Sequence, residues 1–253
     1  MALQFQTEPA RRRPTLRDDL SGVRIAVCPS EPPPPPEPDA LVDIAVAADA
    51  TAGPVDLASF WDVFIDRKLQ LDAVAVGPDR HYVFARGDGV GASRLVRLET
   101  TVVVRALGGE QQKLIAAELE IACSTASKWF TQGLVKLGLA RRPIPLPLVI
   151  AAQARAAGQT PFVAARSATV RREGSFMVLV SVPKPKIRAN GLTPAEEEVA
   201  RLLVDGDSRW EIATKRATSA QTVACQLRGI YSKLGVSGRY ALIRRGVELG
   251  WFA

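Results

Sequence analysis

Toward its C-terminus the chain carries signals that start and stop helices at such short intervals that only short, closely packed helices fit them. Thr193-Pro194-Ala195-Glu196 is a capping box with proline in the first turn, and Asp205-Gly206 is typical of a helix end. Ser208 and Glu211 form a second capping box, and Thr218-Ser219 makes the turn into a third helix. The spacing predicts a helix-turn-helix arrangement.

The third of these helices is predicted to be amphipathic. Val223, Leu227, Ile230 and Leu234 recur at spacings of four, three and four, which places them on one stripe, and Gly235 ends the helix. The other faces carry side chains of the kinds that meet base edges and phosphates. These are Gln221, Thr222, Gln226, Arg228, Ser232 and Lys233. Between residues 209 and 245 the only acidic residue is Glu211, so this segment is predicted to present a basic face.

Several separated motifs between Leu192 and about Leu249 resemble the LuxR-type helix-turn-helix. They are Leu192-Thr193-Pro194 with Glu196, Glu198 and Val199, then Glu211-Ile212-Ala213, Thr222-Val223, and Lys233-Leu234-Gly235-Val236 with Arg239. The resemblance implies a four-helix domain that binds double-stranded DNA, with its third helix in the major groove and a fourth helix that often dimerises. Ala224 and Gln226 depart from the family pattern on the DNA face, so the target sequence cannot be carried over.

The expected DNA contacts of this segment divide by role. Arg209, Lys215, Arg239 and also Arg244 are expected to grip phosphates, with Lys233 on the backbone. Gln221, Thr222, Gln226 and Arg228 are expected to read bases.

The middle of the chain resembles the C-terminal segment when the two are compared at a constant offset of 97 residues. The identities fall on turn and core positions: Gly109, Ile115, Ala116, Thr125, Lys136, Leu137, Gly138 and Arg142 align with Gly206, Ile212, Ala213, Thr222, Lys233, Leu234, Gly235 and Arg239. We expect residues 108–139 to be a diverged second copy, with Lys128 and Lys136 as DNA contacts. Trp129 stands where Gln226 stands, so a structural or dimerising role is the alternative.

Local patterns organise the remaining chain. Residues 32–36 are a polyproline run and are expected to form a stiff extended linker, with one short strand before it at 23–27. Helical spacing predicts helices over 56–69, 98–139 and 149–157. Hairpins are expected at 71–76 with 82–85 and at 165–171 with 176–182.

These features predict a mainly α fold with small β-hairpins, in which two LuxR-like helix-turn-helix units stand in tandem after a variable N-terminal region. The expected divisions are a tail and proline-rich linker (1–38), an α/β region with a hairpin (39–97), a diverged helix-turn-helix (98–158), a hairpin and connector (159–188) and the LuxR-type helix-turn-helix (189–253).

The composition fits a DNA-binding protein of the cytoplasm. The formal net charge of +7 permits nucleic-acid binding, and three widely spaced cysteines argue against a disulfide framework. No apolar run approaches the roughly 18 residues that a membrane helix needs, so no membrane partner is expected.

The sequence offers little chemistry of other kinds. Gly87 to Ala92 formally fit a dinucleotide fingerprint, but they follow a hairpin instead of opening a βαβ unit, so we interpret them as a loop. His81 is the only histidine, lies beside a predicted turn and is expected on the surface. No spacing of metal ligands or nucleophile motif is present, so we expect no enzyme, catalytic residue, metal or cofactor.

The sequence therefore predicts a transcriptional regulator that binds duplex DNA sequence-specifically, in the cytoplasm and associated with the nucleoid. The alternative is a protein-interaction adaptor that binds another regulator or polymerase, which Trp129 and Ala224 favour. Because the segment from 158 to 191 is long, we hypothesise that the fourth helices, around Val149 and Ile243, pair within one chain as a pseudo-dimer on an asymmetric site. The competing arrangement is a homodimer through the C-terminal fourth helix.

Overall fold

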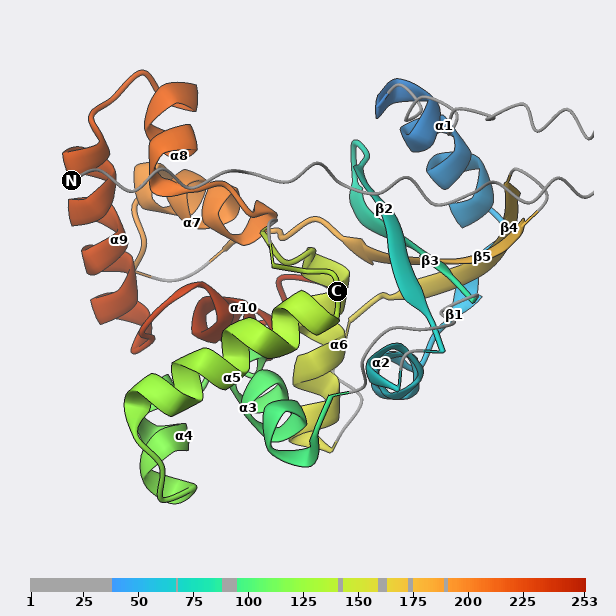
Figure 1. Ribbon diagram of the computed structural model, residues 1–253. Coiled ribbons are helices and arrows are strands. Elements are labelled where there is room, and N and C mark those ends of the chain that lie inside the picture. The colour runs from blue at the N-terminus through green and yellow to red at the C-terminus, as the bar shows by residue number, and fades with distance from the viewer. Residues whose placement is uncertain are drawn as a thin grey trace, which may run out of the picture. The chain divides into compact units, whose positions relative to one another are not determined.

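The computed structural model describes residues 38–66, 68–87, 95–140, 143–158, 163–172, 175–188 and 191–253. Within them the protein is mostly helical with an antiparallel sheet (Figure 1). The elements are α1 (Pro38–Asp49), β1 (Gly53–Pro54), α2 (Leu57–Ile65), β2 (Gln70–Val76), β3 (Arg80–Arg86), α3 (Arg97–Leu107), α4 (Gln112–Glu118), α5 (Cys123–Lys136), α6 (Leu146–Ala157), β4 (Arg166–Arg172), β5 (Ser175–Pro183), α7 (Pro194–Asp205), α8 (Arg209–Lys215), α9 (Ala220–Leu234) and α10 (Arg239–Glu248). The strand expected at 23–27, the polyproline run 32–36 and most of the loop from Gly87 to Ala92 lie outside the described residues.

The two expected hairpins are present and join into one sheet. β2 pairs with β3 and β4 pairs with β5, and β3 and β5 then pair antiparallel along their length, which gives the strand order β1-β4-β5-β3-β2. The division of the sequence placed these hairpins in separate regions, 39–97 and 159–188. That separation is corrected here, because the edges of the two hairpins satisfy each other's backbone hydrogen bonds.

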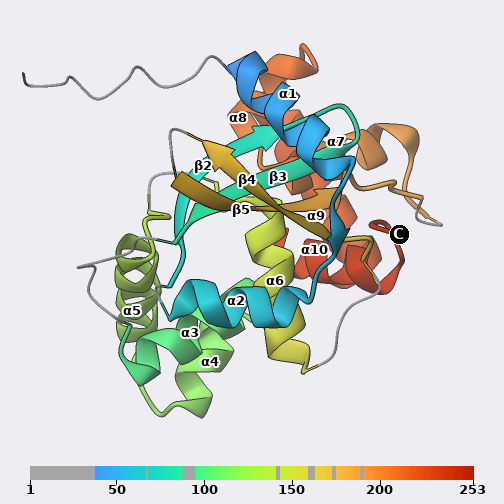
Figure 2. The same cartoon turned by 90° about the vertical axis from the view of Figure 1, so that its right-hand side faces the viewer.

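The sheet is apolar on both faces, because successive side chains of a strand point to opposite faces and consecutive residues of the central strands are apolar. Tyr82 and Phe84 of β3 pack on α1, a helix that the sequence analysis did not predict. Val83 and Ala85 face the opposite way, toward the core that α2 and α6 share. Figure 2 shows α1 over one face of the sheet and α2 and α6 over the other.

A polar cluster fastens the end of α1 to the sheet. Asp49 is buried, and its carboxylate lies 3.4 Å from Arg80 Nε and 3.6 Å from an Arg166 guanidinium nitrogen. The hydroxyl of Ser181 on β5 also donates to Asp49. A buried charge is costly unless it is paired, so these partners fix where α1 ends.

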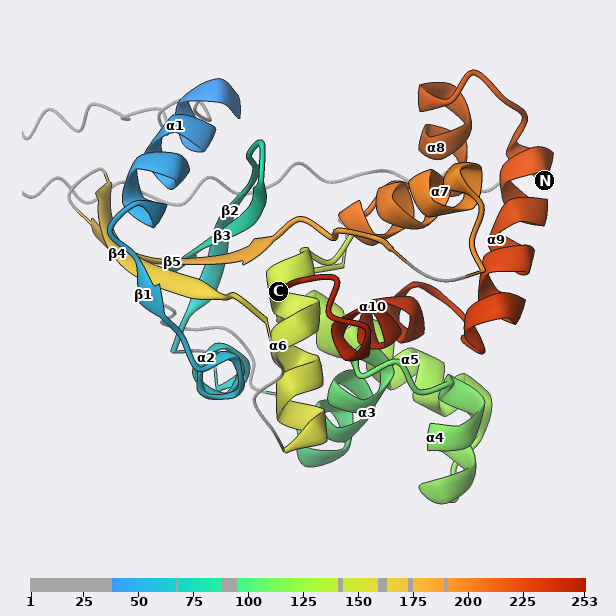
Figure 3. The ribbon, with the colours of Figure 1, turned by 180° about the vertical axis from the view of Figure 1, so that it is seen from behind.

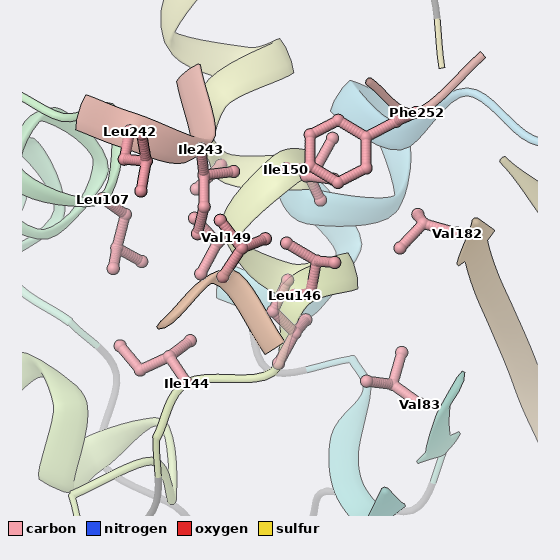
Figure 4. Packing of buried hydrophobic residues seen from close by; sticks show 14 of the residues in the cluster. Val83, Leu107, Ile144, Leu146, Val149, Ile150, Val182, Leu242, Ile243 and Phe252 are labelled. Carbon is pink, nitrogen blue, oxygen red and sulfur yellow. The ribbon is translucent and has the colours of Figure 1, made fainter. Parts of the chain in front are cut away.

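The helix α10 packs inside the chain, between α6 and α9 (Figure 3). Leu242 and Ile243 of α10 are fully buried and meet Val149 and Ile150 of α6 (Figure 4). Gln153 of α6 donates from Nε2 to the carbonyl oxygen of Tyr240 at 2.9 Å and to that of Leu107 at 3.1 Å. One amide thus ties α6 to the start of α10 and to the end of α3.

His81 is a correction to the sequence analysis, which expected it on the surface. Its side chain is 3% exposed, and its Nε2 is 2.9 Å from Oδ1 of Asp205, the last residue of α7. Asp205 also accepts from Arg201, at 3.1 Å. The pair links the sheet to the end of α7, a contact that no local sequence pattern reveals.

Gly109, the second residue after α3, makes a close backbone contact with α10 that is open to test. Gly109 has φ +90°, and a Cβ built there would lie 2.8 Å from the Cα of Ala241. Gly138 has φ +73° but faces open space. We predict that Gly138→Ala lowers the free energy of unfolding by about 1–2 kcal/mol through backbone strain alone. Gly109→Ala is expected to cost about 1–3 kcal/mol more, because α3 and α10 must separate. Urea unfolding of both variants measures the difference, and equal losses would contradict this packing.

Candidate nucleic-acid interface

The C-terminal helices begin where the sequence placed their caps. The Oγ1 of Thr193 accepts from the Glu196 N–H at 3.3 Å, and the Thr193 N–H donates to the Glu196 carboxylate at 2.8 Å. Ser208 and Glu211 repeat this exchange at the start of α8. The Oγ of Ser219 accepts from the Thr222 N–H at 2.9 Å and caps α9. These caps fix short helices in the register that the sequence predicted.

A tight turn and a small core set the angle between α8 and α9. Ala217 occupies the left-handed region with φ +49°, which reverses the chain after α8. Ile212, Val223 and Ile230 are fully buried between α7, α8 and α9. The opposite side of α9 is thereby left toward solvent.

The outward face of α9, as we use the term, consists of its exposed residues other than Lys233: Gln221, Thr222, Cys225, Arg228 and Ser232. Arg228 has no hydrogen bond or ion pair to any other described residue. Hydrogen-bonding groups and one free guanidinium on a helix suit the donor and acceptor pattern of base edges. Cys225 lies at the middle of this face as a free, exposed cysteine, at the position that Lys128 occupies in the central segment.

A second free cation lies at the start of α8. Among the described residues Arg209 has no acidic partner, and its guanidinium carbon lies 5.4 Å from the ring centroid of Trp210. Trp210 is 67% exposed and is a further residue that the sequence analysis overlooked. An exposed large aromatic side chain beside a free arginine suits contact with another molecule.

Three other predicted contacts are already engaged inside the domain. Lys215 Nζ is 2.7 Å from Asp207, and Lys233 Nζ is 2.6 Å from Glu196. The hydrogen bond from Lys233, with that from the Thr193 backbone, lowers the pKa of Glu196. Gln226 Oε1 accepts from Arg216 at 2.8 Å. DNA would have to share or displace these partners.

Arg239 is corrected from a phosphate contact to a structural residue. Its guanidinium donates to the carbonyl oxygens of Leu203, Val204 and Ile144 at 2.9, 3.0 and 3.1 Å. Burial lowers the pKa of Arg239. The side chain therefore closes the C-terminal end of α7, where cations and hydrogen-bond donors are favoured, and it holds that end against the segment before α6.

The predicted contacts of the central segment fall into two classes. Lys128 is exposed on α5, whereas Lys136 Nζ is 2.6 Å from the buried carboxylate of Glu99. Burial acts to raise the pKa of Glu99, but hydrogen bonds from Lys136 and from the Val96 N–H outweigh it and lower that pKa. Trp129 is half-buried and packs against the small core formed by α3 and α4.

Other kinds of site are not evident in the described part of the chain. Its His, Cys, Asp and Glu side chains form no group of three or more that could hold a metal ion. None of its helices has the length and apolar character needed to span a membrane.

Comparison with known proteins identifies the C-terminal domain. Residues 190–245 match the family described as bacterial regulatory proteins, luxR family. Over 64 residues the chain is 41% identical to the transcriptional regulatory protein DesR of Bacillus subtilis (strain 168). That alignment covers 25% of this chain and 32% of the relative, so about a third of the relative's length is matched. The C-terminal domain is a LuxR-type helix-turn-helix, and both names describe regulatory proteins, not enzymes.

The role assigned to Arg239 predicts a loss of stability. Arg239→Ala leaves two carbonyls at the end of α7 and one before α6 without their donor, and we expect the free energy of unfolding to fall by about 2 kcal/mol or more. Arg245→Ala is the control, because its exposed ion pair with Glu248 is expected to contribute no more than about 0.5 kcal/mol. Urea unfolding measures both. If Arg239→Ala leaves stability unchanged and weakens DNA binding, the structural role is contradicted and the phosphate contact that the sequence suggested is supported.

Proposed function

We propose that the protein is a transcriptional regulator of the cytoplasm, associated with the nucleoid, that binds duplex DNA sequence-specifically through the outward face of α9. The observation that carries this proposal is the pair of free guanidinium groups, Arg228 on that face and Arg209 at the start of α8, on a LuxR-type domain. They provide one cation for base edges and one for the backbone.

The engaged side chains refine the expected roles. Arg228, Gln221 and Thr222 are exposed, so we assign base reading to them. Arg209 is the principal phosphate contact, because neither a carboxylate nor a carbonyl among the described residues holds it. Lys215 and Lys233 contribute less, since Asp207 and Glu196 already neutralise them in part.

We further propose that α3, α4 and α5 form a second, diverged helix-turn-helix. Positive φ angles at Gly109, Glu120 and Gly138 recur 97 residues later at Gly206, Ala217 and Gly235, which supports a repeated backbone. The ion pair between Glu99 and Lys136 likewise recurs 97 residues later between Glu196 and Lys233.

The arrangement that we propose for these units is an intrachain pseudo-dimer. The apolar side of α10, which a homodimer through the fourth helix would need, is covered by α6 of the same chain. Leu242 and Ile243 are fully buried there, so a second copy of the chain would find no apolar surface at this position.

The base-reading role of Arg228 predicts a loss of affinity without a loss of stability. Arg228→Ala should weaken binding to a duplex selected from a random pool by about 1–3 kcal/mol, or roughly 5- to 150-fold. Fluorescence anisotropy measures the affinity. Arg245→Ala, an exposed cation of α10, serves as the control and should bind normally. A lower melting temperature with unchanged affinity would mean that the faces of α9 are assigned the wrong way round.

The phosphate contacts predict how binding depends on salt. The logarithm of the binding constant should fall with the logarithm of the salt concentration, with a slope of about 0.9 for each phosphate neutralised. Arg209→Ala should therefore reduce the magnitude of that slope by about 0.9, and by the same amount whatever the DNA sequence. Lys215→Ala should reduce it less, because Asp207 already pairs with that ammonium group. An affinity that does not vary with salt would refute the basic face as a DNA surface and favour the protein-interaction adaptor.

A further inference from the structure

We infer that the duplication includes the β-hairpins as well as the helices, and that a twofold axis relates its two halves, so that one chain places α5 and α9 on DNA half-sites in inverted orientation. The inference rests on the proposed DNA-binding function. It adds how the second half-site is oriented and what holds the two units in that relation.

The first support is the register of the sheet. Val83 of β3 lies directly opposite Val180 of β5, and these two residues are 97 positions apart. His81 pairs with Val182. The residue 97 positions after His81 is Val178, the residue 97 positions before Val182 is Ala85, and these two also pair with each other. An antiparallel ladder has a local twofold axis between facing residues, and here that axis coincides with the repeat.

The second support is a reciprocal contact outside the sheet. A Cβ on Gly109 would lie 3.2 Å from the carbonyl carbon of Tyr240. A Cβ on Gly206, 97 residues after Gly109, would lie 3.4 Å from the Cβ of Pro143, which stands 97 residues before Tyr240. Contacts that exchange in this way are the signature of an isologous, twofold interface.

The order of elements repeats in the same sense. β2, β3 and α3 to α6 are followed by β4, β5 and α7 to α10. In Figure 1 the groups α3 to α5 and α7 to α9 extend from the same side of the shared sheet. Units related by a twofold axis meet DNA in opposite directions along the duplex, whereas units related by translation meet it in the same direction. The axis at Val83 and Val180 therefore selects inverted half-sites.

The two halves differ at the positions that would meet DNA. Gln112 and Glu118 occupy the places of Arg209 and Lys215, so the α5 half holds fewer phosphates. Thr131 stands in the place of Arg228, so the α5 half reads different bases. The natural target then consists of two half-sites in inverted orientation. Because their base sequences differ, the target DNA does not read as an inverted repeat.

A symmetrised variant reveals that hidden orientation. Four substitutions give α5 the outward face of α9: Ser124→Gln, Lys128→Cys, Thr131→Arg and Val135→Ser. All four side chains are exposed, so the fold should be kept, and far-UV circular dichroism checks this. The probes are duplexes that carry the α9 half-site once, twice as a direct repeat, or twice as an inverted repeat with centres about 10 base pairs apart. The α9 half-site is located as the part of the selected site at which Arg228→Ala removes base preference.

We expect the symmetrised full-length chain to bind the inverted repeat about tenfold or more tighter than the direct repeat or the single half-site, with little such preference in the unaltered chain. A direct-repeat preference, or no gain from a second half-site, would overturn the inference. Should the variant not fold, a hydroxyl-radical footprint of the unaltered chain on its selected site decides. Two protected tracts about one turn apart are expected, and one tract overturns the inference. Failure of the proposed function looks different, because neither protein would then bind the single half-site.

Discussion

The pairing of β3 with β5 is the contact on which the rest of the structure depends. It joins two hairpins that are nearly a hundred residues apart in the chain, so its formation must offset the entropy of closing a long loop. The apolar faces of the sheet supply that energy: one face is buried under α1 and the other under α2 and α6. Once the hairpins are paired, α6 and α10 pack against each other in the core. The helical groups α3 to α5 and α7 to α9 are then both attached to the same sheet.

Charged side chains of the C-terminal domain divide into those that hold helices together and those left for a partner. Arg239 closes α7, Arg216 bridges Glu198 and Gln226, and Lys233 pairs with Glu196. The number of basic residues therefore overstates the positive charge available to DNA, because these cations already interact with groups of the domain itself. What remains is a small surface, in which Arg209 and Arg228 carry the free positive charge that the proposed function requires.

Local features could be predicted from the sequence, and features that depend on distant partners could not. The caps at Thr193 and Ser208 and both hairpins were predicted, because neighbouring residues determine them. The joining of the hairpins and the helix α1 were missed, since their partners lie far along the chain. His81 and Arg239 were misplaced for the same reason: the partner of each side chain lies on an element that no local pattern connects to it.

The central claim is that one chain supplies both DNA-reading units. The number of chains bound to one selected duplex tests it most directly, by light scattering or native mass spectrometry of the complex at saturating protein. A pseudo-dimer held by the β3–β5 ladder predicts one chain per duplex, with protection that extends over both half-sites. Two chains on one duplex, related by the symmetry of a palindromic site, would contradict the account.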